Sequence, residues 1–260
     1  MREQTIRFLS VLAITFQITI QIGGWVVPTA AAGAQDGVEQ DMATALKLAS
    51  LLRSARTVIA SNQDLINDPV GGDKGLDGDY VLTLATKAFL EANGTEPLYD
   101  GQDAREARLL SAQITAIQEV MAANQATINQ EGVGFKGFVP AVFGRLVNER
   151  FAELVGDEAV IKVTAPPELI RNRKARPDEW ETEIIRAELA AKDWPKGQVF
   201  TAEAEHDAKP AFRVLVPEYY SEGCLACHGE PKGEIDVTGY PKEGGKLGDL
   251  GGVISISLFR

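Results

Sequence analysis

Apolar residues recur at spacings of three and four as far as Leu154, and the pattern then changes to short runs of β-branched residues. The first pattern is typical of amphipathic helices and the second of strands. Helices are expected at residues 42–62, 78–92, 104–129 and 140–155, and again at 177–194. Strands are expected at residues 159–163, 199–204, 212–216 and 253–258. In the last strand isoleucine alternates with serine, which predicts one buried face and one exposed face.

The order of these elements predicts the fold class. Four helices precede a strand, a helix and three further strands, so we expect a small antiparallel sheet with a large helical part packed on it. This is an α+β fold in which residues 35–157 are mainly helical and residues 158–260 form the sheet. Residues 35–40 are expected to be a polar lead. Residues 35–260 are enough for one domain with a sizeable core.

The N-terminus has the composition of an export signal. Arg2 and Arg7 form a charged segment before an apolar run from Phe8 to Val27, and small residues follow at positions 30–34. This order predicts a signal peptide over residues 1–34, cleaved before Gln35, and therefore a periplasmic protein. The alternative is an uncleaved membrane anchor, because the run is close to the ~20 residues that span a bilayer.

Charge narrows the choice of partners. The chain carries 37 acidic and 26 basic side chains, which gives a formal net charge of −11. This balance argues against nucleic acid and anionic membrane surfaces as partners, and it mildly favours basic ones.

The candidate chemistry lies in one short stretch, Cys224-Leu225-Ala226-Cys227-His228. CxxCH is the pattern of covalent c-type haem attachment, in which two thiols bind the porphyrin and the adjacent histidine ligates the iron. These are the only two cysteines, so a wider disulfide framework or a cysteine-rich zinc site is excluded. A disulfide or a thioredoxin-like redox pair is the alternative, but a redox pair is expected within a βαβ pattern that this segment lacks.

Several further segments lie around the motif in a recognisable order. They are Phe138–Phe143, Arg171-Asn172, Pro177–Glu181, Phe212–Pro217 and Gly248–Ile254. Together with the motif they resemble the single-haem c-type proteins with a PAS-like fold, which occur as stand-alone exported proteins and as sensor modules. The resemblance implies one covalent haem c, a PAS-like sheet, and a role in redox or small-ligand sensing rather than enzymatic activity.

The chain departs from this family's pattern at two places. Arg173 and Ala175 stand where the family usually has a proline and an asparagine. Some members also supply a cysteine thiolate as the sixth iron ligand, and no third cysteine is present here. A cysteine thiolate is therefore not expected as the sixth iron ligand of this chain.

The expected haem site contains His228 as an axial iron ligand beside Cys224 and Cys227. The sixth position stays open, because a five-coordinate or water-bound iron is as plausible as any protein ligand. Its candidate ligands are His206, Met42 and Met121. The candidates for contact with the haem propionates or ring edge are Arg213, Arg171 and Tyr220.

Two other functions remain open beside sensing. A periplasmic electron carrier would exchange electrons with an exported redox protein, whereas a sensor would bind a small diatomic ligand or change redox state and be read by an exported signalling protein. A haem peroxidase is the third alternative, and His206 is the histidine available as its distal acid/base group.

Overall fold

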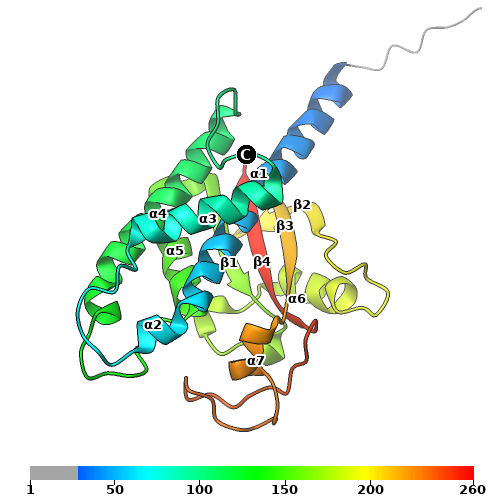
Figure 1. The fold of residues 1–260 in the computed structure, drawn as a ribbon. Helices are drawn as coiled ribbons and strands as arrows, with labels where there is room; N and C mark the ends of the chain where they lie inside the picture. The colour runs from blue at the N-terminus through cyan, green and yellow to red at the C-terminus, as the bar shows by residue number, and fades with distance from the viewer. Residues whose placement is uncertain (1–28) are drawn as a thin grey trace, which may run out of the picture.

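The computed structural model describes residues 29–260, which form an antiparallel sheet with helices packed against it (Figure 1). The helices are α1 (Thr29–Ser61), α2 (Gln63–Asn67), α3 (Gly78–Asn93), α4 (Ala104–Ile128), α5 (Pro140–Val155), α6 (Glu179–Ile184) and α7 (Glu222–His228). The strands are β1 (Ala159–Thr164), β2 (Phe200–His206), β3 (Lys209–Tyr219) and β4 (Leu250–Phe259). The predicted α+β class is confirmed.

The four strands form one sheet in the order β1-β4-β3-β2, and every neighbouring pair is antiparallel. Strand β3 is the longest and pairs with both β2 and β4, so Val214 lies opposite Thr201 on one side and Ile256 on the other. The ladder between β3 and β4 changes register between Glu218 and Tyr219. This irregularity comes just before the chain leaves the sheet for α7.

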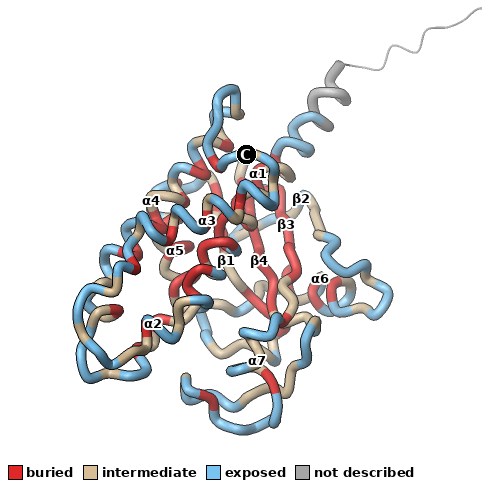
Figure 2. Tube along the Cα trace, viewed as in Figure 1, coloured by how far each residue is buried: buried red, intermediate tan, exposed pale blue. Residues whose placement is uncertain are grey.

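Helices α1, α3, α4 and α5 build the main core over one face of the sheet (Figure 2). Because successive side chains of a strand point to opposite faces, Ile254, Ile256 and Leu258 of β4 all lie on this face, where they are fully buried. Helix α5 presents Phe143, Val147 and Phe151 at a spacing of four, which places them on one helix face. The helical and sheet parts therefore share one core.

The other face of the sheet is covered as well. Helix α6 continues into a π-helical turn at Ile185–Leu189, and Ile185 packs with Leu215 and Val253 in a second apolar cluster. Ser255 and Ser257 of β4 lie on this face and are only 3% and 1% exposed. The prediction of an exposed serine face was wrong, because small hydroxyl side chains here point under a covering layer rather than into water.

Helix α1 is longer than the sequence pattern predicted. Residues 35–40, expected as a polar lead, are helical and exposed at 36–40 because this end of α1 extends beyond the sheet (Figure 1). The predicted signal peptide at residues 1–34 lies outside the described residues, except that 29–34 belong to α1. From Thr29 onward, no helix combines the length and apolar character needed to cross a bilayer.

Capping residues explain why the starts of α3 and α4 agree with the sequence. The helix expected at residues 177–194 is shorter, because α6 and its π-helical turn end at Leu189. Asp77 accepts a hydrogen bond from the backbone N–H of Tyr80 at the start of α3, and Gly94 ends that helix with a left-handed φ of 73°. Asp103 accepts from the N–H groups of Arg105 and Glu106 at the start of α4. Such side-chain caps fix a helix start locally, so they are visible in the sequence.

Candidate functional site

The CxxCH stretch forms the short helix α7, although the sequence pattern predicted no helix between residues 216 and 253. The chain leaves β3 at Tyr219, enters α7 at Glu222 and stops after His228, where Gly229 follows. Cys224 is three residues before Cys227 and four before His228. In a helix these spacings place all three side chains on the same face. The motif is therefore presented as a unit at one end of the sheet (Figure 1).

Both thiols are free and half-buried. The hydroxyl of Ser221 lies 3.3 Å from the Sγ atom of Cys224. Burial, followed by the nearby carboxylate of Asp236, raises the pKa of the Cys227 thiol. Cys227 is therefore protonated at neutral pH and retains the hydrogen that a thiol addition requires.

His228 is held through one ring nitrogen and one ring face. Its Nδ1 lies 2.9 Å from Oε2 of Glu243, and its ring stacks on Tyr220 with 5.1 Å between centroids and an angle of 21° between planes. Its carbonyl oxygen accepts a hydrogen bond from the N–H of Gly245 at 2.8 Å. Because Nδ1 is engaged with Glu243, Nε2 is the nitrogen left to ligate a metal.

Arg171 holds the carboxylate of Glu243 with two nitrogens, Nε at 2.8 Å and Nη2 at 3.0 Å. The same guanidinium donates to Asp236 at 2.6 Å and to the carbonyl of Cys227 at 2.9 Å. Burial acts to raise the pKa of Glu243, but hydrogen bonds from Arg171 and His228 outweigh it, so the net pKa lies below the ordinary value. Glu243 is therefore a carboxylate at neutral pH.

Asp236 holds Nη1 of Arg171, the nitrogen of the guanidinium that does not contact Glu243. It also accepts hydrogen bonds from the hydroxyl of Thr238 and from the backbone N–H groups of Thr238 and Tyr240. Burial acts to raise the pKa of Asp236, but these bonds and Arg171 hold it well below its usual range. Nη1 of Arg171 also lies 3.4 Å from the hydroxyl oxygen of Thr238. All five N–H donors of this guanidinium are thus taken up by the protein, which argues against the predicted pairing of Arg171 with a haem propionate.

Residues 229–249 form the irregular segment that wraps this cluster. Hydrogen bonds join the N–H of Gly248 to the carbonyl of Tyr220 at 2.8 Å and the N–H of Tyr220 to the carbonyl of Asp249 at 2.9 Å. The segment exposes three large apolar side chains, Ile235, Val237 and Leu247, each more than 60% accessible to solvent. It therefore offers apolar surface close to the motif.

Tyr220 lies at the centre of the site. Its ring is buried, and its Oη is buried without a hydrogen-bond partner. Burial, followed by the charge of Glu243, raises the pKa of Tyr220 to about 12, so the hydroxyl keeps its proton. A buried hydroxyl without a partner is uncommon, and a bound polar group would satisfy it.

Glycines press against opposite edges of the Tyr220 ring. A Cβ atom added at Gly251 would collide with one edge, and a Cβ atom added at Gly245 would collide with the other. Gly251→Ala should therefore lower the free energy of unfolding by about 1–3 kcal/mol, the usual cost of overpacking a filled site. Chemical denaturation measures this loss.

Gly134→Ala is the matched control, because a Cβ atom at Gly134 has no neighbour within 4 Å. It should leave the denaturation midpoint close to that of the wild type. Equal stability of Gly251→Ala and the wild type would show that the Tyr220 ring has room to move and does not fix His228.

Two predicted site residues lie far from α7. His206 ends β2 opposite Lys209, at the start of β3, whereas α7 follows the end of β3 at Tyr219. At about 3.4 Å per residue the ten steps along β3 separate them by roughly 30 Å. His206 instead has its Nδ1 2.7 Å from the hydroxyl of Ser257. It is therefore not a ligand at an iron held by His228.

Arg213 is also removed from the motif and is 1% exposed. Its guanidinium lies 2.6 Å from Asp178 and 3.4 Å from Glu181, and it stacks over Trp180 at 4.2 Å. The structure therefore does not bring this predicted propionate partner to α7. The side chain supports the face of the sheet beneath α6.

Neither methionine candidate lies beside the motif. Met42 follows Asp41, which pairs with Arg260 just beyond the end of β4, at the opposite end of the sheet from α7. Met121 is fully buried in the main core. Among the described residues, the proposed sixth ligands are thus all engaged elsewhere.

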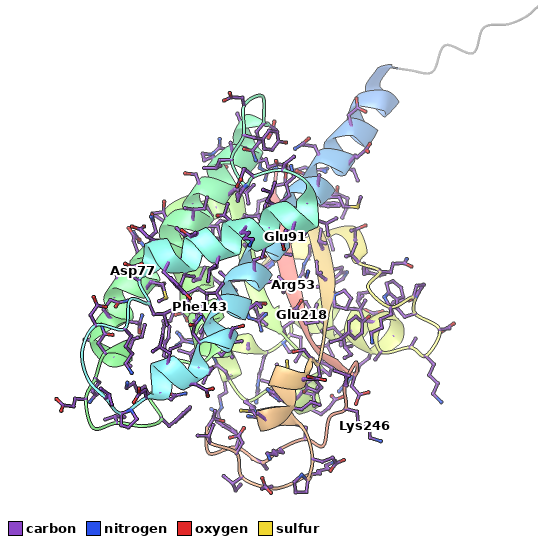
Figure 3. All side chains as sticks on the ribbon, in the orientation of Figure 1. Arg53, Asp77, Glu91, Phe143, Glu218 and Lys246 are labelled. Atoms are coloured by element: carbon purple, nitrogen blue, oxygen red, sulfur yellow. The ribbon has the colours of Figure 1, made fainter. Side chains whose placement is uncertain are left out.

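The sequence pattern missed the two carboxylates that support the site, Glu243 and Asp236. They lie in an irregular segment without periodicity, so only their acidic character in a Gly- and Lys-rich stretch could have marked them. It also missed Glu218, whose carboxylate forms ion pairs with Arg53 at 2.6 Å and with Arg56 at 3.0 Å. Arg53 and Glu218 are labelled in Figure 3. These ion pairs tie α1 to the last part of β3, just before the motif.

Comparison with known proteins gives one match. The family described as Tll0287-like (Tll0287) matches residues 99–258, a range that includes α4, α5, α6, α7, the strands β1, β2 and β3, and β4 as far as Leu258. No curated protein and no solved structure matches the chain.

Proposed function

Because the chain belongs to the Tll0287-like family, we propose that it is an exported protein that binds one haem c covalently and works in redox or small-ligand sensing. The observation that carries the proposal is the arrangement of α7. Cys224, Cys227 and His228 share one helix face, and the Nδ1 of His228 is engaged so that Nε2 remains for the iron.

The residues of the site fit a haem. Two free, half-buried thiols stand one helical turn apart, and no disulfide consumes them. The partnerless Oη of Tyr220 supplies a buried hydrogen-bonding group, and Ile235, Val237 and Leu247 supply exposed apolar surface that a macrocycle would cover. In the protein alone the thiols are unbonded, the hydroxyl lacks a hydrogen bond and the apolar side chains face solvent. A flat apolar ligand with polar edges would engage all three kinds of group.

The roles of the side chains follow from this fit. Cys224 and Cys227 would hold the haem through thioether bonds, each thiol adding its sulfur and its hydrogen across one vinyl group. His228 would hold the iron through Nε2, while Glu243 holds Nδ1 and Tyr220 holds the ring plane. When bound, the haem supplies a one-electron iron couple and a coordination position for a small ligand.

Covalent haem attachment has a direct spectroscopic test. The protein, exported in cells that carry a c-type maturation system, should give a pyridine haemochrome spectrum of the thioether-linked type with one haem per chain. Haem that is removed by acidified organic solvent would contradict covalent attachment through Cys224 and Cys227.

The location of the candidate ligands favours sensing over simple electron transfer. His206, Met42 and Met121 lie away from α7, so none of these three side chains would occupy the sixth position of an iron on His228. A carrier normally keeps two strong ligands. The peroxidase alternative loses its proposed distal group, because His206 is at the far end of β3.

Carbon monoxide distinguishes the sensor from the carrier. The reduced haem protein should bind carbon monoxide, with a shift of its main absorption band, because none of the three candidate protein ligands lies at α7 to compete for the sixth position. An unchanged spectrum at saturating carbon monoxide, together with fast electron exchange, would support the electron carrier instead.

A further inference from the structure

His228 is bound through Nδ1 to a carboxylate, and this contact has a chemical consequence beyond holding the ring. The partner of the second ring nitrogen fixes the tautomer of a metal-ligating histidine and raises the basicity of the ligating nitrogen. A carboxylate accepts a stronger hydrogen bond than a backbone carbonyl, because the bond is charge-assisted. The 2.9 Å distance between Nδ1 and Oε2 of Glu243 is within the range of such a bond.

Arg171 acts on the same carboxylate from the opposite side. Its two hydrogen bonds to Glu243, at 2.8 and 3.0 Å, form the fork that guanidinium and carboxylate prefer. The guanidinium shares the negative charge of Glu243 and so reduces its pull on the imidazole N–H. Asp236 and the carbonyl of Cys227 hold Arg171 in this position at 2.6 and 2.9 Å.

Resting on the haem-binding function proposed above, we infer that Glu243 and Arg171 are positioning residues that tune the electron donation of His228 to the iron in opposite directions. Glu243 strengthens the donation, which stabilises the ferric state and lowers the reduction potential. Arg171 weakens it and raises the potential. The reduction potential of the site is therefore the balance of the two side chains.

The same segment contains a matched control for charge. Glu234 pairs with Lys242 at 2.7 Å, and both residues lie in the loop that carries Glu243. Glu234→Gln removes one negative charge from this loop, as Glu243→Gln does. Only Glu243 has a hydrogen bond to His228. The pair of variants separates loss of the hydrogen bond from loss of charge.

The test is a spectroelectrochemical titration of the haem-loaded full-length protein. Glu243→Gln should shift the potential to a more positive value, and Arg171→Gln should shift it to a more negative value. Glu234→Gln should give a shift much smaller than that of Glu243→Gln. The electron paramagnetic resonance g values of the ferric protein should change with Glu243→Gln and stay constant with Glu234→Gln.

Shifts of the same sign in Glu243→Gln and Arg171→Gln would overturn the inference, because loosening of the loop would move both potentials alike. Equal shifts in Glu243→Gln and Glu234→Gln would also overturn it. If either glutamine variant loses its haem, Glu243→Asp and Arg171→Lys take their places with the same opposite signs expected. A wild-type protein without covalent haem would instead contradict the proposed function itself.

Discussion

Replacing both Cys224 and Cys227 by serine should abolish covalent haem attachment completely. A hydroxyl is slightly smaller than a thiol and does not add to a vinyl group under these conditions, so no thioether forms. The two residues are the only cysteines of the chain, which leaves no other thiol to substitute for them. Haem staining after denaturing electrophoresis of the exported protein measures the loss, and the stained band should disappear.

Ala226→Ser is the matched control for this experiment. Ala226 lies between the two cysteines on α7 and is exposed, so the added hydroxyl changes the motif without removing a thiol. This variant should keep the full haem stain. A stained band that persists in the double serine variant would mean that haem is bound elsewhere or by another linkage, and the assignment of α7 would then be wrong.

Arg213→Ala should lower the free energy of unfolding by about 3–5 kcal/mol, the typical loss when one partner of a buried ion pair is removed. Arg213 is 1% exposed, and the Glu181 side chain beside it is fully buried. The change leaves the carboxylate of Glu181 with fewer compensating charges and removes the contact with Trp180. Chemical denaturation measures the loss.

Arg150→Ala provides the comparison for Arg213, because Arg150 also pairs with two glutamates, Glu119 and Glu153, but at the surface. This variant should leave the midpoint of chemical denaturation almost unchanged, because exposed ion pairs contribute little to stability. A loss for Arg213→Ala no larger than that for Arg150→Ala would show that the buried network adds nothing to stability.

Acid should weaken the same network. Burial acts to raise the pKa of Asp178, but hydrogen bonds from the backbone of Glu181 and from Arg213 lower it below its ordinary value. The carboxylate is therefore more acidic in the folded chain. Its contribution is complete above the unfolded pKa of about 3.9 and is lost as the pH falls through the folded value.

The sequence predicted those parts of the fold that depend on neighbouring residues. Helices α3 and α4 begin where Asp77 and Asp103 cap them, so their boundaries follow from local chemistry. The burial of Ser255 and Ser257 was missed, because the covering layer of α6 comes from a segment more than sixty residues away. Helix α7 was missed because seven residues are too few to show helical periodicity.

The residues of the candidate site also fall into those that the sequence predicts locally and those that only the fold brings together. Cys224, Cys227 and His228 are contiguous, so the motif is visible without a structure. Glu243 follows His228 by fifteen residues in an irregular segment, and only folding brings its carboxylate to Nδ1. Arg171 was expected near the site through the resemblance, but its partners are carboxylates of the protein itself.

The proposal that this chain carries one covalent haem on α7 is tested most directly by the mass of the intact protein under denaturing conditions. Protein produced in cells that carry a c-type maturation system should have the mass of its polypeptide plus one haem. The double serine variant should lack the added mass. A wild-type protein whose denatured mass is that of the polypeptide alone would contradict the proposal.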